Sequence, residues 1–408
     1  MAHVLLAPDK FKGSLTASEV TRYLGLGFRR ACPRVRVRGF PVADGGEGTL
    51  DAAASAGFRR MPVTATGPSG RPVRTAFAER DGVAVVELAD ACGMRRLPGR
   101  QKHPLHASSH GVGDVVRAAL DHGCHRIVVG LGGSASTDGG AGLVSALGAR
   151  LLDRRGIELP PGGAALRRVE RIDLTRLHPR VRAIRLVVAS DVDNPLLGPA
   201  GAAAVYAPQK GATPADVAVL EEGLARWAEV CERDLGVRVA EAAGAGAAGG
   251  VGFAALAVLR ATMRPGIEFL LGLLGFERLL EEAGLVVTGE GSLDAQSLRG
   301  KAPVGVAAAA ALASVPTVAV AGRVALSEGE LLAAGIHRAY ALSDLEPNIA
   351  RSIARAPELL EAIAARVAAD WLDPTGRMLT KPLQRRDCYE SPRQDRLHAG
   401  SRIRRSAP

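Results

Sequence analysis

Two acidic loops of this 408-residue chain contain residue types that bind metals or move protons. Residues 44–49 read DGGEGT, so two carboxylates share a tight turn, where they repel each other unless a cation or hydrogen-bond donors compensate. Mg²⁺ favours such carboxylate sites when phosphates complete them. Residues 191–195 read DVDNP, where an Asp can act as a general base, although Asp and Asn also simply favour turns. The candidates in these loops are Asp44, Gly45, Gly46, Glu47, Asp191, Asp193 and Asn194.

A glycine-rich loop over residues 130–140, GLGGSASTDGG, is suited to binding an anion. Its small side chains leave backbone N–H groups open to a phosphate or a carboxylate. The loop also matches the dinucleotide pattern GxGxxG/A at Gly130, Gly132 and Ala135, with Asp153 about 20 residues further on. That pattern is weak evidence, because residues 244–249 match it as well. The candidates in this loop are Gly132, Gly133, Ser134 and Asp138.

Three further loops combine glycine with lysine or acidic residues. Residues 7–14 contain two lysines ahead of a predicted helix, and residues 208–214 contain a lysine just before another. A helix N-terminus adds free N–H groups and partial positive charge, so a nearby lysine favours an anion site. Residues 288–301 repeat this mixture after a predicted strand, although each loop could also be a solvated turn or a helix cap. The candidates are Lys10, Lys12, Gln209, Lys210, Thr288, Gly289, Glu290, Asp294 and Lys301.

Familiar nucleophile and nucleotide motifs are missing from the sequence. It contains no GxxxxGK followed by Ser or Thr, no GxSxG and no HExxH. Acids, lysines and glycine loops without a Ser, Cys or His nucleophile suit phosphoryl transfer, where the protein mainly positions groups and neutralises charge. Lysines would offset phosphate, carboxylates would hold Mg²⁺, and one Asp would accept the proton of the acceptor hydroxyl.

Alternating strands and helices are predicted to position these loops. At the N-terminal end we expect strands at 3–7 and 35–40 and helices at 16–31 and 50–56. The alternation resumes after residue 285, with strands at 285–288, 317–321 and 338–342 and helices at 304–313, 328–334 and 348–371. Between these parts we expect extended segments over 62–90, strands at 126–131 and 185–190, and helices at 112–121, 140–147, 214–231 and 253–264.

This order predicts a two-domain α/β fold. A doubly wound parallel sheet would comprise residues 1–61 and 281–372, and a mixed α/β domain over 62–280 would be inserted into it. Residues 373–408 would form a basic, disordered tail, since residues 374–408 carry nine basic and three acidic side chains and few apolar ones. Substrates usually bind in a cleft between such domains.

The composition limits the kinds of partner and the cellular compartment that are expected for this protein. The net charge is +10, but much of it belongs to the tail, and aromatic residues are only 3%, so nucleic acid is not the implied partner. Five scattered cysteines without a CxxC pair indicate a reducing, cytoplasmic environment. Charged residues occur within the first ten positions, so the N-terminal segment does not resemble a signal peptide. Residues 302–322 lack charge, but Pro316 divides them, so a buried helix and strand are expected rather than a membrane span.

Seven motifs in this order closely resemble the bacterial type 1 glycerate kinases. They are APDKFKGSL, PVADGGEGT, GLGGSASTDGGAG, DVDNPL, PQKGATP, GAGAAGG and TGEGSLDAQ with a later GKAP. The resemblance covers about residues 3–371 and implies ATP-dependent phosphorylation of D-glycerate, commonly to 2-phosphoglycerate, with Mg²⁺. It also implies one flavodoxin-like domain and one inserted domain. Ser190, Lys10 and Ser292 depart from the usual family residues, which are Cys, Ser and Arg.

The resemblance implies a role for several of these residues. Asp191 would be the base on the glycerate hydroxyl with Asp193 nearby, and Lys12 and Lys210 would hold phosphate or the substrate carboxylate. Mg²⁺ or substrate hydroxyls would be positioned by acidic residues, and an anion would lie in the glycine loop. The acidic residues are Asp44, Glu47 and Glu290, and the loop residues are Gly132, Gly133 and Ser134.

Two other functions remain open from the sequence. An NAD(P)-dependent hydroxy-acid dehydrogenase would use the loop Gly130–Ala135 and Asp153, and a polyanion-binding protein would act through the arginine-rich tail. The first is tested by NAD(P)H binding, and the second by deleting residues 374–408. The sequence also leaves room for a homodimer.

Overall fold

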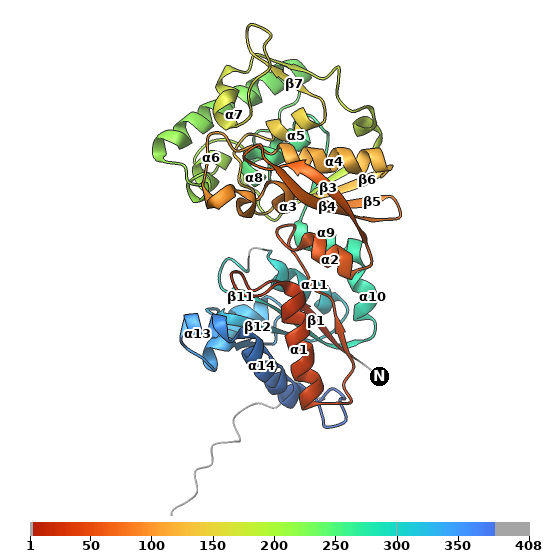
Figure 1. The fold of residues 1–408 in the computed structure, drawn as a ribbon. Helices are drawn as coiled ribbons and strands as arrows, with labels where there is room; N and C mark the ends of the chain where they lie inside the picture. Colours follow the sequence, from red (N-terminus) through yellow and green to blue (C-terminus); the bar gives the residue numbers. More distant parts are fainter. Residues whose placement is uncertain (1–2, 299, 380–408) are drawn as a thin grey trace, which may run out of the picture.

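The structure, a computed structural model, describes residues 3–298 and 300–379, and it has two lobes that each contain a sheet (Figure 1). The first sheet is entirely parallel and has the order β13-β12-β11-β1-β2. Numbered along the chain, this is the flavodoxin-like order 2-1-3-4-5, so the predicted fold class is confirmed. The strands are β1 His3–Pro8, β2 Val37–Gly39, β11 Ala283–Leu293, β12 Thr317–Val324 and β13 Arg338–Ala341.

Helices cover both faces of this sheet because its strands alternate their side chains. Val4 and Leu6 of β1 pack against α1 and α14, whereas Leu5 packs on the opposite face with α2, α9, α10 and α11. The helix predicted at 16–31 is present as α1, and a capping box of Thr16 and Glu19 begins it. The helices of this lobe are α1 Ala17–Ala31, α2 Thr49–Ser55, α9 Gly266–Leu274, α10 Phe276–Leu280, α11 Ala302–Leu312, α12 Glu328–Ala333, α13 Ile349–Ala354 and α14 Ala356–Trp371.

The second sheet is mixed and has the order β10-β9-β6-β5-β4-β3. The pairs β10–β9, β9–β6 and β6–β5 are parallel, and β5, β4 and β3 form an antiparallel meander. Asp81 and Gly82, both at positive φ, make the tight turn between β4 and β5. The strands are β3 Arg59–Thr66, β4 Pro72–Arg80, β5 Val83–Glu87, β6 Arg126–Gly130, β9 Arg185–Ala189 and β10 Thr262–Arg264.

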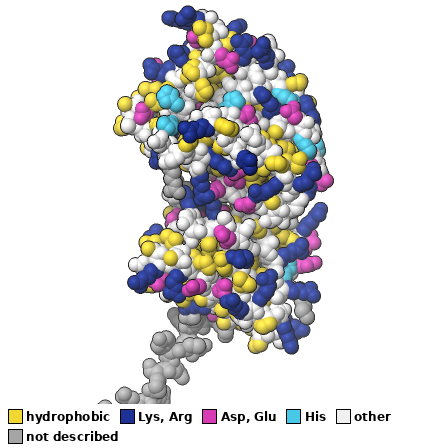
Figure 2. All heavy atoms as spheres, viewed as in Figure 1, with side chains coloured by type: hydrophobic (Ala, Val, Ile, Leu, Met, Phe, Trp, Pro, Cys, Tyr) yellow, Lys and Arg dark blue, Asp and Glu magenta, His cyan; other side chains and the backbone are white. Residues whose placement is uncertain are grey.

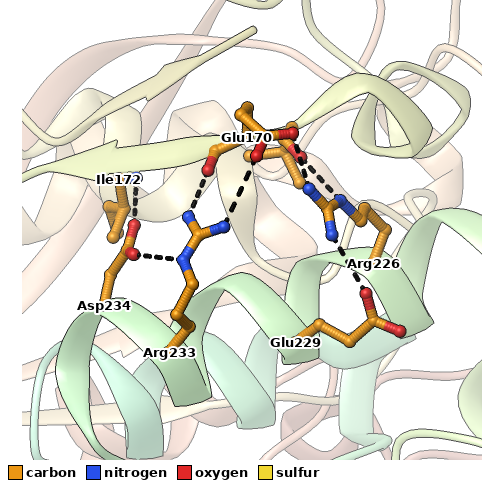
Figure 3. A network of polar contacts seen from close by, with 7 residues as sticks. Glu170, Ile172, Arg226, Glu229, Arg233 and Asp234 are labelled. Atoms are coloured by element: carbon orange, nitrogen blue, oxygen red, sulfur yellow. Dashed lines mark hydrogen bonds and ion pairs between the residues drawn. The ribbon is translucent and has the colours of Figure 1, made fainter. Parts of the chain in front are cut away.

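A second set of helices packs on this sheet around the core of the inserted lobe. They are α3 Leu88–Cys92, α4 His110–His122, α5 Ala141–Ala146, α6 Ala202–Tyr206, α7 Pro214–Leu235 and α8 Ala247–Ala257. The longest, α7, is also tied to the small hairpin β7 Arg150–Leu152 and β8 Arg171–Asp173 by a polar network (Figure 3). Arg226 Nη2 lies 2.6 Å from Glu170 Oε2, and Ile172 N donates to Asp234 Oδ2 at 3.0 Å. The network holds α7 in place at the surface.

Two short helices join the lobes. Both α2 and α9 lie between the two sheets (Figure 1). Leu50 of α2 and Ile267 of α9 share one buried cluster with Leu5 of the first sheet and Val85 of the second. The chain passes between the sheets at residues 56–58 and again at 265–282. Because β3 begins at Arg59 and α9 and α10 pack with the first sheet, the predicted division into residues 1–61 with 281–372 and an inserted part over 62–280 stays a prediction.

Several boundaries differ from those predicted. The expected helix at 253–264 corresponds to α8, which is kinked at residues 248–250, and the end of the expected helix is instead the strand β10. The expected helix at 348–371 is divided in two at Arg355, just before a proline in the first turn of α14. Residues 302–322 form α11 and much of β12, as expected. No helix in the described part of the chain is long and apolar enough to span a membrane.

The first residues of the predicted tail pack onto the fold. Leu379 N donates to the carbonyl oxygen of Trp371, and Met378 packs against the core beneath α1 and α14. The packed chain therefore extends as far as Leu379, further than predicted. The remainder of the predicted basic tail, residues 380–408, lies outside the described residues.

Candidate active site

A cavity of about 730 Å³ lies where the lobes meet. Basic and acidic side chains gather at this waist of the molecule (Figure 2). The cavity is lined from both lobes, and loops far apart in the sequence converge there. The predicted site residues that line it are Lys12, Asp44, Gly46, Glu47, Gly132, Gly133, Ser134, Asp191, Gln209 and Lys210.

Strand register explains why these loops converge. Glu87 at the end of β5 pairs with Gly130 at the end of β6, and Gly130 pairs with Ala189 at the end of β9. The loops that follow these three strands therefore begin at the same edge of the sheet. The carboxyl ends of parallel strands are the usual binding edge in α/β proteins. In the other sheet, β1 ends beside β11, which brings the loop containing Lys12 to the cavity.

Only one carboxylate oxygen of Asp191 accepts hydrogen bonds within the described residues. Its Oδ1 accepts hydrogen bonds from Gly266 N at 2.6 Å and Ile267 N at 3.4 Å, at the start of α9. Its Oδ2 is buried and has no hydrogen-bond partner within the described residues. Burial, followed by the nearby Asp44 charge, raises the pKa of Asp191 to about 7. A carboxylate with this pKa and a free oxygen is suited to accept a proton near neutral pH.

Lys210 is the most deeply buried cation of the cavity wall. Only 3% of it is exposed, and its Nζ donates to Ser134 Oγ at 2.8 Å and to the carbonyl oxygen of Ser136 at 2.5 Å. Burial lowers the pKa of Lys210 to about 7. An anion bound beside this amine would favour its charged form. The helix predicted after this loop is present as α7, and Thr213 and Asp216 form a capping box at its start.

The two glycine loops are pressed against each other. Gly132 N donates to the carbonyl oxygen of Gly45 at 3.2 Å, and a Cβ on Gly132 would overlap Gly46. A Cβ on Gly130 would likewise overlap the Gly45 carbonyl group. Glycine is therefore required at these positions for backbone contact between the lobes, while Gly132, Gly133 and Gly46 also face the cavity.

The acidic residues predicted to bind Mg²⁺ are only partly brought together. Asp44 and Glu47 line the cavity, and Glu47 forms an ion pair with Arg95. Glu290 lies behind the lining, 8% exposed, with Oε2 3.8 Å from Lys301 Nζ. Within residues 3–298 and 300–379, no three His, Cys, Asp or Glu side chains form a metal-binding group. Asp44 and Glu47 fit a site that phosphate oxygens would complete.

Asp9 was missed by the sequence reasoning, although it lies in a loop that was singled out. It is buried beside Lys10, whose Nζ lies 3.4 Å from Asp9 Oδ1. Burial raises the pKa of Asp9 to about 7, and the Asp44 charge contributes. Burial likewise raises the pKa of Glu290, again with a contribution from Asp44. The Asp44 charge therefore contributes to the raised pKa of Asp9, Asp191 and Glu290.

Other predicted residues support the loops from outside the lining. Asp138 is fully buried and accepts hydrogen bonds from Ser109 N at 2.8 Å and Gly142 N at 3.2 Å. Asn194 Oδ1 accepts a hydrogen bond from Tyr206 Oη at 2.5 Å, and Asp193 is exposed. Direct ligand contacts by these residues stay predictions. The predicted residues outside the lining are Lys10, Gly45, Asp138, Asp193, Asn194, Thr288, Gly289, Glu290, Asp294 and Lys301.

The cavity also contains charged residues that the sequence reasoning did not select. Glu87 reaches it from the end of β5, a position that could have been suspected because an acid ends an apolar strand. Arg95 and Arg96 reach it from the loop after α3 and pair with Glu47 and Asp90. No local pattern distinguishes these arginines from ordinary surface charges. They add positive charge on the side of the inserted lobe.

Comparisons with known proteins identify the family that this chain resembles. A model of the glycerate kinase family matches residues 4–372. A glycerate kinase from Bacillus subtilis (strain 168) is 41% identical over 369 residues, covering 90% of this chain and 97% of that protein. A glycerate 2-kinase from Escherichia coli (strain K12) is 41% identical over 343 residues, covering 83% and 90%.

A solved structure gives the same result for the fold. The crystal structure of a Salmonella typhimurium LT2 protein assigned as glycerate kinase 2 matches with a TM-score of 0.78 and 40% identity, covering 90% of this chain and 97% of that one. Sequence, fold and family model thus agree over nearly the whole described chain. The chain belongs to the glycerate kinase family of phosphotransferases.

Proposed function

We propose that the protein transfers the γ-phosphoryl group of ATP to a hydroxyl group of D-glycerate, with Mg²⁺ and with Asp191 as general base. The observation that supports this proposal is the buried Oδ2 of Asp191, which lies in the same cavity wall as the Lys210 amine and the glycine loop. A base and an anion site in one cavity are what transfer of a phosphoryl group to an alcohol requires.

The proposed reaction follows from the position of these groups. Asp191 accepts the hydroxyl proton of glycerate while the hydroxyl oxygen bonds to the γ-phosphorus. The bond from that phosphorus to the bridging oxygen breaks, and ADP leaves with the electron pair. Lys210, Lys12 and the N–H groups of the glycine loop bind phosphate or the glycerate carboxylate. Asp44 and Glu47 would hold Mg²⁺, which neutralises phosphate charge.

The dehydrogenase alternative is not supported. Its glycine pattern runs from Gly130 to Ala135, but the next helix begins only at Ala141, so this turn does not open a helix as a dinucleotide loop does. Gly130 and Gly132 instead contact the opposite glycine loop. Asp153 lies in the turn after β7, where it accepts hydrogen bonds from Arg155 N and Ile157 N.

We further propose 2-phosphoglycerate as the product, since the Escherichia coli relative is named glycerate 2-kinase. The test is incubation with Mg-ATP and D-glycerate, followed by ³¹P NMR of the product. A resonance of 2-phosphoglycerate that depends on added Mg²⁺ is expected. A 3-phosphoglycerate resonance would overturn the regiochemistry, and ATP-independent NAD(P)H oxidation would overturn the reaction class.

The pH dependence of kcat/KM should be bell-shaped with a maximum near neutrality. Asp191 must be deprotonated to accept a proton, so the rate rises as pH increases through its pKa of about 7. Lys210 must be protonated to bind an anion, so the rate falls as pH increases through its pKa of about 7. Initial rates between pH 5.5 and 9 test this. A flat profile would contradict both assignments.

We also propose that the enzyme acts in the cytoplasm on small molecules, with neither nucleic acid nor a membrane as partner. Cys32, Cys92, Cys124 and Cys231 are all buried free thiols, which suits a reducing compartment. A homodimer remains a prediction, which sedimentation of the full chain would test.

A further inference from the structure

The two helices between the sheets are fixed by carboxylates from the inserted sheet. Asp191, after β9, accepts N–H groups at the start of α9. Glu87, the last residue of β5, does the same for the start of α2. One of these carboxylates is the proposed base. The other has no role in the proposed reaction, although it lines the same cavity.

The contacts of Glu87 cross between the lobes. Its Oε2 accepts hydrogen bonds from Gly48 N at 3.2 Å and Leu50 N at 3.0 Å. The side chain is 6% exposed, so water cannot easily replace it as an acceptor for these two donors. Gly48 is the last residue of the acidic loop 44–48, which contains Asp44 and Glu47, and Leu50 lies two residues further on.

The acidic loop is therefore held at both ends by the opposite lobe. Near its start, the Gly45 carbonyl accepts from Gly132 N at 3.2 Å, and at its end Glu87 binds Gly48 and Leu50. A Cβ on Gly266 would overlap the carbonyl oxygen of Asp44, so this loop passes directly over the start of α9, where Asp191 is held. A shift of the loop would change the distance between Asp44 and Asp191.

We infer that Glu87 is a positioning residue: by accepting two backbone N–H groups across the lobes, it fixes the acidic loop 44–48 opposite Asp191. It contacts no reacting atom. Its effect on turnover rests on the proposed function, whereas its effect on the loop does not. A misplacement of about 1 Å in such a loop lowers rates by roughly 10²-fold, so loss of the acceptor should affect kcat more than KM.

The test compares Glu87→Ala, Glu87→Gln and Glu79→Ala in the full chain. The Gln amide oxygen can still accept both N–H groups, whereas Ala cannot. Glu79 is the matched control, since its Oε1 accepts Gly82 N at 3.0 Å within the same sheet and away from the cavity. We expect Glu87→Ala to lower kcat about 10- to 100-fold and to raise the Mg²⁺ concentration needed for half-maximal rate. The kcat of Glu87→Gln should stay within about threefold of the wild-type value, and the kcat of Glu79→Ala should equal the wild-type value.

Hydrogen–deuterium exchange provides a readout that needs no activity. The amides of residues 48–50 should exchange faster in Glu87→Ala than in wild type, with protection restored in Glu87→Gln. If Glu87→Ala does not fold, Glu87→Asp replaces it, because its shorter side chain withdraws the acceptor while keeping the charge. Wild-type kcat and wild-type exchange in the Ala or Asp variant would overturn the inference. Absence of glycerate phosphorylation by the wild-type chain would overturn the proposed function but leave the exchange result interpretable.

Discussion

Replacing Asp191 by Asn should lower kcat by roughly 10²- to 10⁴-fold, the range for loss of a general base. The amide is nearly isosteric, and its oxygen can still accept the hydrogen bond from Gly266 N, so the fold should be retained. What disappears is a group that can take the hydroxyl proton. The measurement is the steady-state rate of ADP formation with saturating ATP and D-glycerate, together with a thermal melt.

Asp153→Asn is the matched control. Asp153 is a half-buried Asp in a turn of the inserted lobe, and it is the acid on which the dehydrogenase alternative relied. This variant should have wild-type kcat. An Asp191→Asn enzyme with nearly wild-type turnover would remove Asp191 from the base role, whatever its effect on KM.

Replacing Lys210 by Met should raise the KM of an anionic substrate roughly 10- to 100-fold, because a hydrogen bond to a charged group contributes about 1.5–3 kcal/mol. The buried amine lies beside Ser134 and reaches the cavity wall, so an anion there would be left without its countercharge. Met has similar length and suits a buried position. Separate titrations with ATP and D-glycerate show which substrate Lys210 binds.

Lys102→Met serves as the control for this experiment. Lys102 lies beside the same segment, where its Nζ donates to the carbonyl oxygen of Gln209 at 3.0 Å, but its side chain is exposed. Its replacement should leave both KM values unchanged. If Lys210→Met also leaves both KM values and the descending limb of the pH profile unchanged, Lys210 binds no substrate anion.

Local signals in the sequence predict much of the fold. The capping boxes at Thr16 and Thr213 mark helix starts that the structure contains, and the Asp81-Gly82 turn joins two strands within the segment predicted to be extended. These features depend on neighbouring residues, which a sequence shows directly. The helix break at Arg355 and the strand β10 depend on packing and pairing with distant segments, and the sequence pattern did not predict them.

Part of the candidate site was also predictable from local sequence patterns. Loops after strands could be expected to meet at one edge, and Asp191, Lys210 and the two glycine loops do line one cavity. An acid at the end of the apolar strand β5 could have drawn attention to Glu87, but its partners, two backbone N–H groups of another lobe, could not be predicted. The carboxylate of Asp138 accepts hydrogen bonds from backbone N–H groups inside the fold, and its predicted contact with a ligand stays a prediction.

The central claim is that a base and an anion site converge in one cavity to phosphorylate glycerate. A crystal structure with D-glycerate and a non-hydrolysable ATP analogue tests it most directly. We expect a glycerate hydroxyl within about 2.6–3.2 Å of Asp191 Oδ2, with the terminal phosphate in the same cavity. Glycerate bound elsewhere, or with its hydroxyl groups directed away from Asp191, would contradict it.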